Sequence, residues 1–135
     1  MTYNTVNQAN TWALAHPTKD VGSGGPSWSG WCAALMFWAG NFERSCDTAT
    51  QGSYSSNIVS TDPTAAPAGA FHWWRMGSEG HVALDLDGKG TRLLMASSKV
   101  SNYGSAIGTI SWAQYAGASV SGHGKLPIGG HGTAH

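Results

Sequence analysis

One apolar segment constrains the fold of this 135-residue chain more than any other. It runs from residue 31 to residue 42, and Cys32 stands at its second position. Large apolar side chains recur there at helical spacing: Trp31, Leu35, Trp38 and Phe42. The positions between them are also mostly apolar, as in a helix that is buried on nearly all sides. We therefore expect a buried helix over residues 31–42, with Gly40 near its end.

A second helix is expected before this segment, over Thr5–Ala15. Val6, Ala9 and Ala13 lie on one stripe of that helix. Asn4 or Thr5 is the expected N-cap, and Pro17 ends the pattern. The following Gly- and Ser-rich segment, residues 18–30, is typical of a loop. It lacks the Gly-Lys-Ser/Thr ending that a phosphate-binding loop needs, which argues against nucleotide binding.

The second half of the chain changes to strand-like patterns. Polar residues 43–67 contain one short predicted helix near Ser55–Val59, and an aromatic strand is expected over Ala70–Met76. Further strands are expected at His81–Leu86, Thr91–Ser97 and about Ala106–Ser111, the first two joined in a hairpin by an Asp-Gly turn. Helices followed by antiparallel strands predict the α+β class, in a domain over residues 1–120. The Gly- and His-rich residues 121–135 are expected to form a loose tail or linker stub.

The composition excludes several kinds of partner. Seven basic and seven acidic residues balance, so neither nucleic acid nor an anionic membrane surface is indicated. No apolar run approaches the roughly 20 residues of a membrane span, and the polar N-terminus does not resemble a signal peptide. Two cysteines are too few for a disulfide framework. A helix over residues 32–42 would also separate its ends by roughly 15 Å, so we expect Cys32 and Cys46 to be free thiols.

Cys32 is the candidate nucleophile, because a helix N-terminus stabilises a thiolate. A thiol nucleophile needs a base and a group that orients the base. His81, which follows Gly80 at the start of a predicted strand, is the candidate base. A hairpin turn centred on Lys89 would place Ser97 opposite His81. A turn centred between Gly88 and Lys89 would place Ala96 opposite His81 instead. Ser97 is our first choice for the orienting group, with Asp85 or Ser98 as alternatives.

Three segments of the chain resemble a known family. They are Trp31–Phe37, Ala66–Trp74 and Gly80–Leu84, with sequences WCAALMF, APAGAFHWW and GHVAL. They are similar to the signature blocks of the CHAP and NlpC/P60 cysteine peptidases, in which a cysteine opens a helix and a Gly-His-Val-Ala strand follows. Their order and spacing fit over roughly Ala9–Gly117, and the arrangement is closest to endolysin catalytic domains from phages of actinobacteria.

The resemblance implies a papain-like fold in which N-terminal helices pack on a small antiparallel sheet. It implies a bacterial peptidoglycan hydrolase that cleaves an amide bond, with Cys32 as nucleophile and His81 as base. The third position, which is usually Asn, Asp, Glu, Gln or His in the family, falls on Ser97 here. The oxyanion hole would consist of the Cys32 N–H and one donor from the Ser27–Gly30 loop. This chemistry requires no metal or cofactor.

The resemblance also implies where such a protein works. We expect a monomer that is made in the host bacterial cytoplasm and acts at the cell wall during lysis.

Two alternative functions are considered. One is a non-catalytic, Trp-rich module that binds the cell wall. The other is an interbacterial toxin of the same fold that acts on a different amide.

Other residues have weaker functional signals. Among seven tryptophans, Trp28, Trp31 and Trp73 are the candidates for substrate binding, although most Trp residues are expected to pack in the core. Trp74 flanks the same segments, and His72 is interpreted as a packed or cleft-edge residue. Three histidines could suggest a metal site in the tail: His123, His131 and His135. No carboxylate or cysteine accompanies them, so no metal site is expected.

Overall fold

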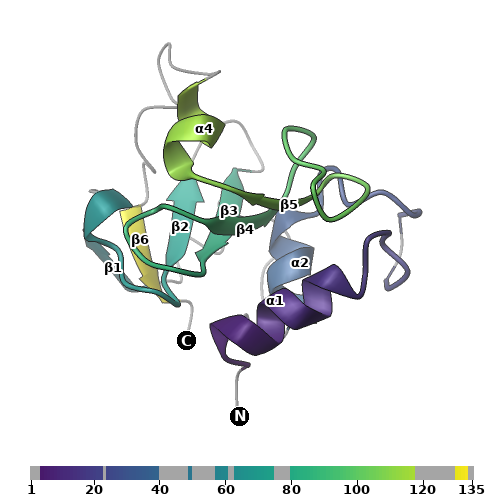
Figure 1. Ribbon diagram of the computed structural model, residues 1–135, viewed down its shortest axis with the longest axis horizontal. Helices are drawn as coiled ribbons and strands as arrows, with labels where there is room; N and C mark the ends of the chain where they lie inside the picture. The colour runs from purple at the N-terminus through teal and green to yellow at the C-terminus, as the bar shows by residue number, and fades with distance from the viewer. Residues whose placement is uncertain are drawn as a thin grey trace.

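The computed structural model describes residues 4–22, 24–39, 49, 57–60, 63–74, 80–117 and 130–133. Within these residues, antiparallel strands form one six-stranded sheet in the order β1-β6-β2-β3-β4-β5 (Figure 1). The strands are β1 (Asn57–Ser60), β2 (Phe71–Trp74), β3 (His81–Asp85), β4 (Leu93–Ala96), β5 (Ile107–Ile110) and β6 (Gly130–Thr133). The α+β class is therefore confirmed.

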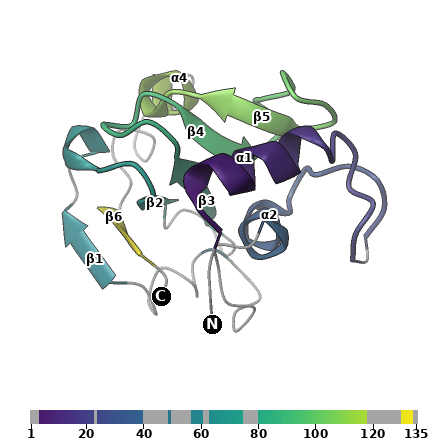
Figure 2. The same ribbon diagram turned by 60° about the horizontal axis from the view of Figure 1, so that its bottom comes forward.

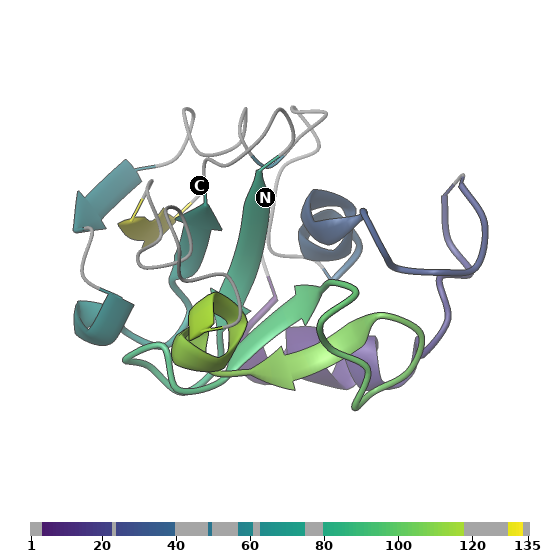
Figure 3. The same cartoon turned by 90° about the horizontal axis from the view of Figure 1, so that it is seen from above.

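The described helices cover both faces of the sheet. They are α1 (Val6–Leu14), α2 (Cys32–Trp38), α4 (Trp112–Gly117) and a short 3-10 helix, η1 (Pro63–Ala65). α1 and α2 lie on one face and α4 on the other (Figures 1 and 3). Because successive strand residues point to opposite faces, β2 contributes Phe71 and Trp73 to the core beneath α1 and α2. Trp74, the next residue, packs with Tyr115 of α4 on the opposite face.

α1 begins at the predicted N-cap. The Thr5 Oγ1 accepts the Gln8 N–H at 3.2 Å, and the Gln8 Oε1 accepts the Thr5 N–H at 2.9 Å. This reciprocal capping box satisfies two N–H groups at the start of the helix. Ala9 and Ala13 are buried against the sheet, as their spacing predicts. Figure 2 shows α1 lying along the β4–β5 side of the sheet, far from β1 and β6.

α2 is shorter and less buried than the sequence predicts. It ends at Trp38 with Ala39 as C-cap, and Phe42 lies outside the described residues. Leu35 and Met36 are its buried residues, whereas the other helical residues are only partly buried. The expectation of a helix buried on nearly all sides is therefore wrong, because only one flank of α2 contacts β3 and β4.

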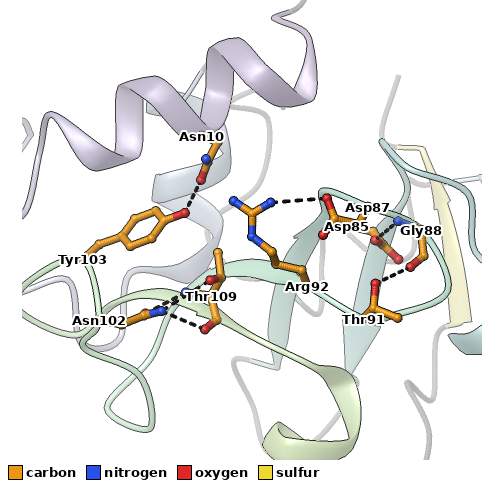
Figure 4. A network of polar contacts seen from close by, with 9 residues as sticks. All are labelled: Asn10, Asp85, Asp87, Gly88, Thr91, Arg92, Asn102, Tyr103 and Thr109. Atoms are coloured by element: carbon orange, nitrogen blue, oxygen red, sulfur yellow. Dashed lines mark hydrogen bonds and ion pairs between the residues drawn. The ribbon is translucent and has the colours of Figure 1, made fainter.

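The β3–β4 hairpin has the register that a turn centred on Lys89 predicts. Leu84 pairs with Leu94 and Asp85 with Leu93, which places Lys89 midway. Lys89 itself has a φ of 61°, a left-handed conformation that is rare for a residue with a Cβ. Asp85 stabilises this turn through its buried carboxylate. The carboxylate accepts the Gly88 N–H at 2.6 Å (Figure 4). It also accepts the Gly90 N–H at 2.8 Å and the His72 Nε2–H at 2.9 Å.

Polar contacts also join α1 to the last strands of the hairpin region. The Tyr103 hydroxyl donates to the Asn10 Oδ1 of α1, and the Thr109 N–H of β5 donates to the Asn102 Oδ1 at 2.9 Å (Figure 4). Arg92 donates to the exposed Asp87 carboxylate at 3.2 Å, and its hydrogen bond with Tyr103 is the largest of the effects that raise the pKa of Arg92. These contacts fix the edge of the sheet against α1.

Two segments differ from the sequence-based expectation. Asn57–Ser60 form strand β1 where a short helix was predicted over Ser55–Val59, and residues 51–56 lie outside the described part. Gly130–Thr133, within the expected tail, form β6 between β1 and β2. This part of the tail therefore belongs to the sheet. Its backbone groups find partners on both sides, which offsets the low strand propensity of glycine.

None of the described helices has the length and apolar character that crossing a membrane requires.

Candidate active site

Cys32 is the first residue of α2 and is partly exposed. The loop before it is held by Trp28, whose buried indole Nε1–H donates to the His16 carbonyl at 2.9 Å. Gly30 has a φ of 84°, so the chain reverses there before the helix begins. The buried Trp28 and the reversal at Gly30 together set where α2 starts, and therefore where the thiol lies.

The same loop leaves few donors for an oxyanion. Its N–H groups already donate within the protein: Trp28 to the Ser105 carbonyl, Ser29 to the Ser27 Oγ and Trp31 to the Trp28 carbonyl. In the described part of this loop, Gly30 is then the nearest residue to Cys32 whose N–H has no such partner. Among the loop residues, Gly30 is therefore the candidate for the second oxyanion donor.

His81 opens β3 on the face of the sheet that α4 covers. Its side chain is buried, with 4% of the residue exposed. The imidazole stacks on the Tyr115 ring, with centroids 4.4 Å apart and planes 6° apart, and the Trp74 ring lies 5.1 Å away. The His81 Nε2 is buried and has no hydrogen-bond partner among the residues that the structure describes. The ring is therefore held by aromatic contact.

The environment of His81 keeps its imidazole uncharged. Burial, and secondly the positive charge of Lys99, lower its pKa from 6.5 to about 3. The ring is neutral at physiological pH and can accept a proton.

Acid should destabilise the protein through His81. Its lowered pKa means that the unfolded state binds a proton near pH 6.5 while the folded state does not. The free energy of unfolding should therefore fall as the pH drops below about 6.5, by about 2 kcal/mol at about pH 5. Urea unfolding followed by Trp fluorescence across this range measures the loss. The free energy of unfolding of His81→Gln should fall by about 2 kcal/mol less over the same pH range. An equal dependence of the free energy of unfolding on pH in the two proteins would contradict the prediction.

Tyr115 connects the two candidate catalytic residues. It stacks on His81, and its hydroxyl lies within electrostatic reach of Cys32. Burial, followed by the negative charge of Cys32, raises the Tyr115 pKa to about 12, while a hydrogen bond with Ser97 acts in the opposite direction. Sequence reasoning missed Tyr115. The only local signal was the apolar pair Trp112 and Tyr115 at helical spacing, which says nothing of its contact with β3.

Ser97 lies close to the site but does not contact His81 through a hydrogen bond. The observed β3–β4 pairs are Leu84–Leu94 and Asp85–Leu93, so the expected pairing of Ser97 with His81 stays a prediction. The Ser97 hydroxyl accepts the Lys99 N–H at 3.2 Å. Asp85 is occupied by His72 and the turn, so it does not orient His81. Ser98 is exposed in the following turn.

The candidate substrate-binding tryptophans are placed differently. Trp28 and Trp73 are 0% exposed and pack in the core beneath α1 and α2. We therefore assign both to the core, which corrects the expectation that they bind substrate. Trp31 is partly exposed, with the Lys19 Nζ 4.4 Å from its ring centroid. It is the one of the three with surface that a ligand could reach.

The histidines considered for other roles are only partly covered by the described residues. His72 is 0% exposed and bonds Asp85, which agrees with its interpretation as a packed residue. His123 and His135 lie outside the described residues, and His131 is described only as backbone in β6. Among described side chains, no three His, Cys, Asp or Glu residues gather as a metal site would require.

Comparison with protein-family models, curated proteins and solved structures found no match to this chain.

Proposed function

We propose that this protein is a cysteine-dependent hydrolase that cleaves an amide bond of bacterial peptidoglycan. The observation that carries the proposal is the position of Tyr115, which stacks on His81 and lies within electrostatic reach of Cys32. A thiol at the start of a helix and a neutral imidazole at the start of a strand thereby share one neighbour. The substrate class rests on the resemblance of three segments to CHAP and NlpC/P60 peptidases.

The proposed reaction uses both residues in the usual order of thiol catalysis. His81 takes the Cys32 proton, and the thiolate attacks the amide carbonyl. The Cys32 and Gly30 N–H groups stabilise the oxyanion. The protonated His81 then gives its proton to the leaving amine, and water hydrolyses the thioester to release a carboxylate.

The low pKa of His81 makes it a weak base as long as Cys32 is a neutral thiol. An imidazole shielded from water binds a proton poorly on its own. A thiolate that forms beside it supplies the opposite charge that makes protonation favourable. Proton transfer is thereby coupled to formation of the nucleophile.

The rival of a Trp-rich wall-binding module has less support. Such a module needs exposed aromatic rings, whereas Trp28, Trp73 and Trp74 are all 0% exposed. A toxin amidase would share the Cys32–His81 chemistry and differ only in the bond that it cuts. The products of the reaction distinguish the two enzymes.

The test is digestion of purified peptidoglycan, followed by mass spectrometry of the soluble muropeptides. We expect one type of amide bond to be cut, with one water gained per cleavage. The Cys46→Ser variant should be used, so that iodoacetamide can block only Cys32. Blocking Cys32 should stop the reaction. Wall binding without cleavage would favour the binding module, and cleavage that survives alkylation would exclude Cys32 as the nucleophile.

A further inference from the structure

The orientation of His81 lacks the usual explanation. In Cys- and Ser-dependent sites, a third residue accepts a hydrogen bond from the base and fixes the ring plane. The three residues proposed for this role from the sequence do not fill it: Ser97, Asp85 and Ser98. The His81 Nε2 is buried with no hydrogen-bond partner in the described part of the chain. Some other contact must fix the ring.

We propose that Tyr115 is the positioning residue for His81, through flat stacking of its ring on the imidazole. This inference rests on the proposed function, because it assigns Tyr115 a role in presenting His81 to Cys32. The near-parallel planes, 6° apart at a centroid distance of 4.4 Å, allow the imidazole to slide but not to tilt. Aromatic stacking thus replaces the hydrogen bond of a third residue.

Tyr115 can position His81 only if Tyr115 is itself held in place, and several contacts hold it. The Lys99 Nζ lies 4.4 Å from its ring centroid and donates to its carbonyl oxygen at 3.1 Å. The Trp74 ring packs 4.9 Å away, so contacts from β2 and from the turn after β4 converge on one residue of α4.

Tyr115 also influences the charge state of His81. Tyr115 covers one face of the imidazole and Trp74 lies near it, which excludes water and helps to lower the pKa of His81. Lys99 after β4 acts electrostatically on His81, and Cys32 of α2 acts on Tyr115. The His72–Asp85 pair of β2 and β3 lies on the same face of the sheet as His81. Removing the Tyr115 ring would let water reach His81 without changing any of these charges.

Three variants test the proposal. Tyr115→Leu removes the ring, Tyr115→Phe keeps the ring and removes the hydroxyl, and Trp112→Leu removes a ring from the same helix and the same apolar cluster. We expect Tyr115→Leu to lower kcat for muropeptide hydrolysis by about 100-fold with little change in KM, because misplacing a catalytic group costs on this order. Tyr115→Phe and Trp112→Leu should stay within about threefold of wild type.

An independent readout is the NMR titration of the His81 ring. In wild type and Tyr115→Phe, the ring should not titrate between about pH 8 and about pH 5, whereas in Tyr115→Leu its pKa should rise toward 6.5. Circular dichroism confirms folding, and Tyr115→Met replaces the leucine variant if that variant does not fold.

The proposal is overturned if Tyr115→Leu matches Trp112→Leu in both kcat and titration, or if Tyr115→Phe is as impaired as Tyr115→Leu. If wild type hydrolyses nothing, the proposed function fails on its own, and the titration still reports whether Tyr115 shields His81.

Discussion

Replacing Cys32 by alanine should lower the rate of peptidoglycan hydrolysis by about 10⁴-fold or more, because removal of a catalytic nucleophile leaves only the effects of binding and oxyanion stabilisation. The fold should persist. Cys32 is partly exposed at the start of α2, and alanine is the best helix former. The free energy of unfolding should therefore change by less than about 1 kcal/mol. Release of soluble muropeptides measures the rate, and thermal unfolding measures the stability.

Two further variants make this result specific. Cys32→Ser keeps the size of the side chain but offers a weaker nucleophile, so its activity should be nearly as low as that of the alanine variant. Cys46→Ala serves as the matched control and should retain wild-type activity. Substantial activity in Cys32→Ala, or its loss in Cys46→Ala, would show that the nucleophile has been assigned to the wrong cysteine or that catalysis needs none.

The largest effect on stability is expected at Asp85. Asp85→Ala should lower the free energy of unfolding by about 3–5 kcal/mol, the range measured when one partner of a buried charged network is removed. The substitution strands three buried donors that now reach the carboxylate: the N–H groups of Gly88 and Gly90 and the His72 Nε2–H. Urea unfolding monitored by circular dichroism at neutral pH measures the loss.

Asp87 provides the control for Asp85 within the same turn. Its carboxylate pairs with Arg92 at 3.2 Å, but the two side chains are 48% and 42% exposed. Exposed ion pairs contribute little, so Asp87→Ala should cost less than about 1 kcal/mol. Asp85→Asn, which keeps one acceptor oxygen, should fall between the two alanine variants. Equal costs for Asp85→Ala and Asp87→Ala would contradict the role of Asp85 in organising the turn.

The parts of the fold that sequence predicts well depend on local rules. The N-cap at Thr5 acts within one helical turn, and the turn centred on Lys89 is one of the two hairpin registers that the sequence allows. β6 could not be predicted in this way. Its Gly-His-Gly-Thr sequence lacks strand periodicity, and the segment is a strand only because β1 and β2 offer unpaired edges on both sides.

In the candidate site, too, some features depend on local sequence and others on tertiary packing. Cys32 and His81 are each identifiable from their neighbours in sequence, a helix start and a Gly-preceded strand start. Tyr115 and Lys99 come to His81 through packing across the sheet face, which no local pattern encodes. The burial of Trp28 and Trp73 is likewise a tertiary property, because the residue type alone does not distinguish a tryptophan in the core from one in a cleft.

The place of β6 in the sheet has a consequence for how the chain completes its fold. β1 and β2 are close in sequence, yet they meet only through a strand made some 60 residues later. During synthesis, the edge of β2 therefore stays open until the last described segment emerges. Long-range pairing of this kind slows folding and exposes a strand edge to other chains. Cutting the chain at residue 120, where composition suggests a domain end, would make that exposure permanent.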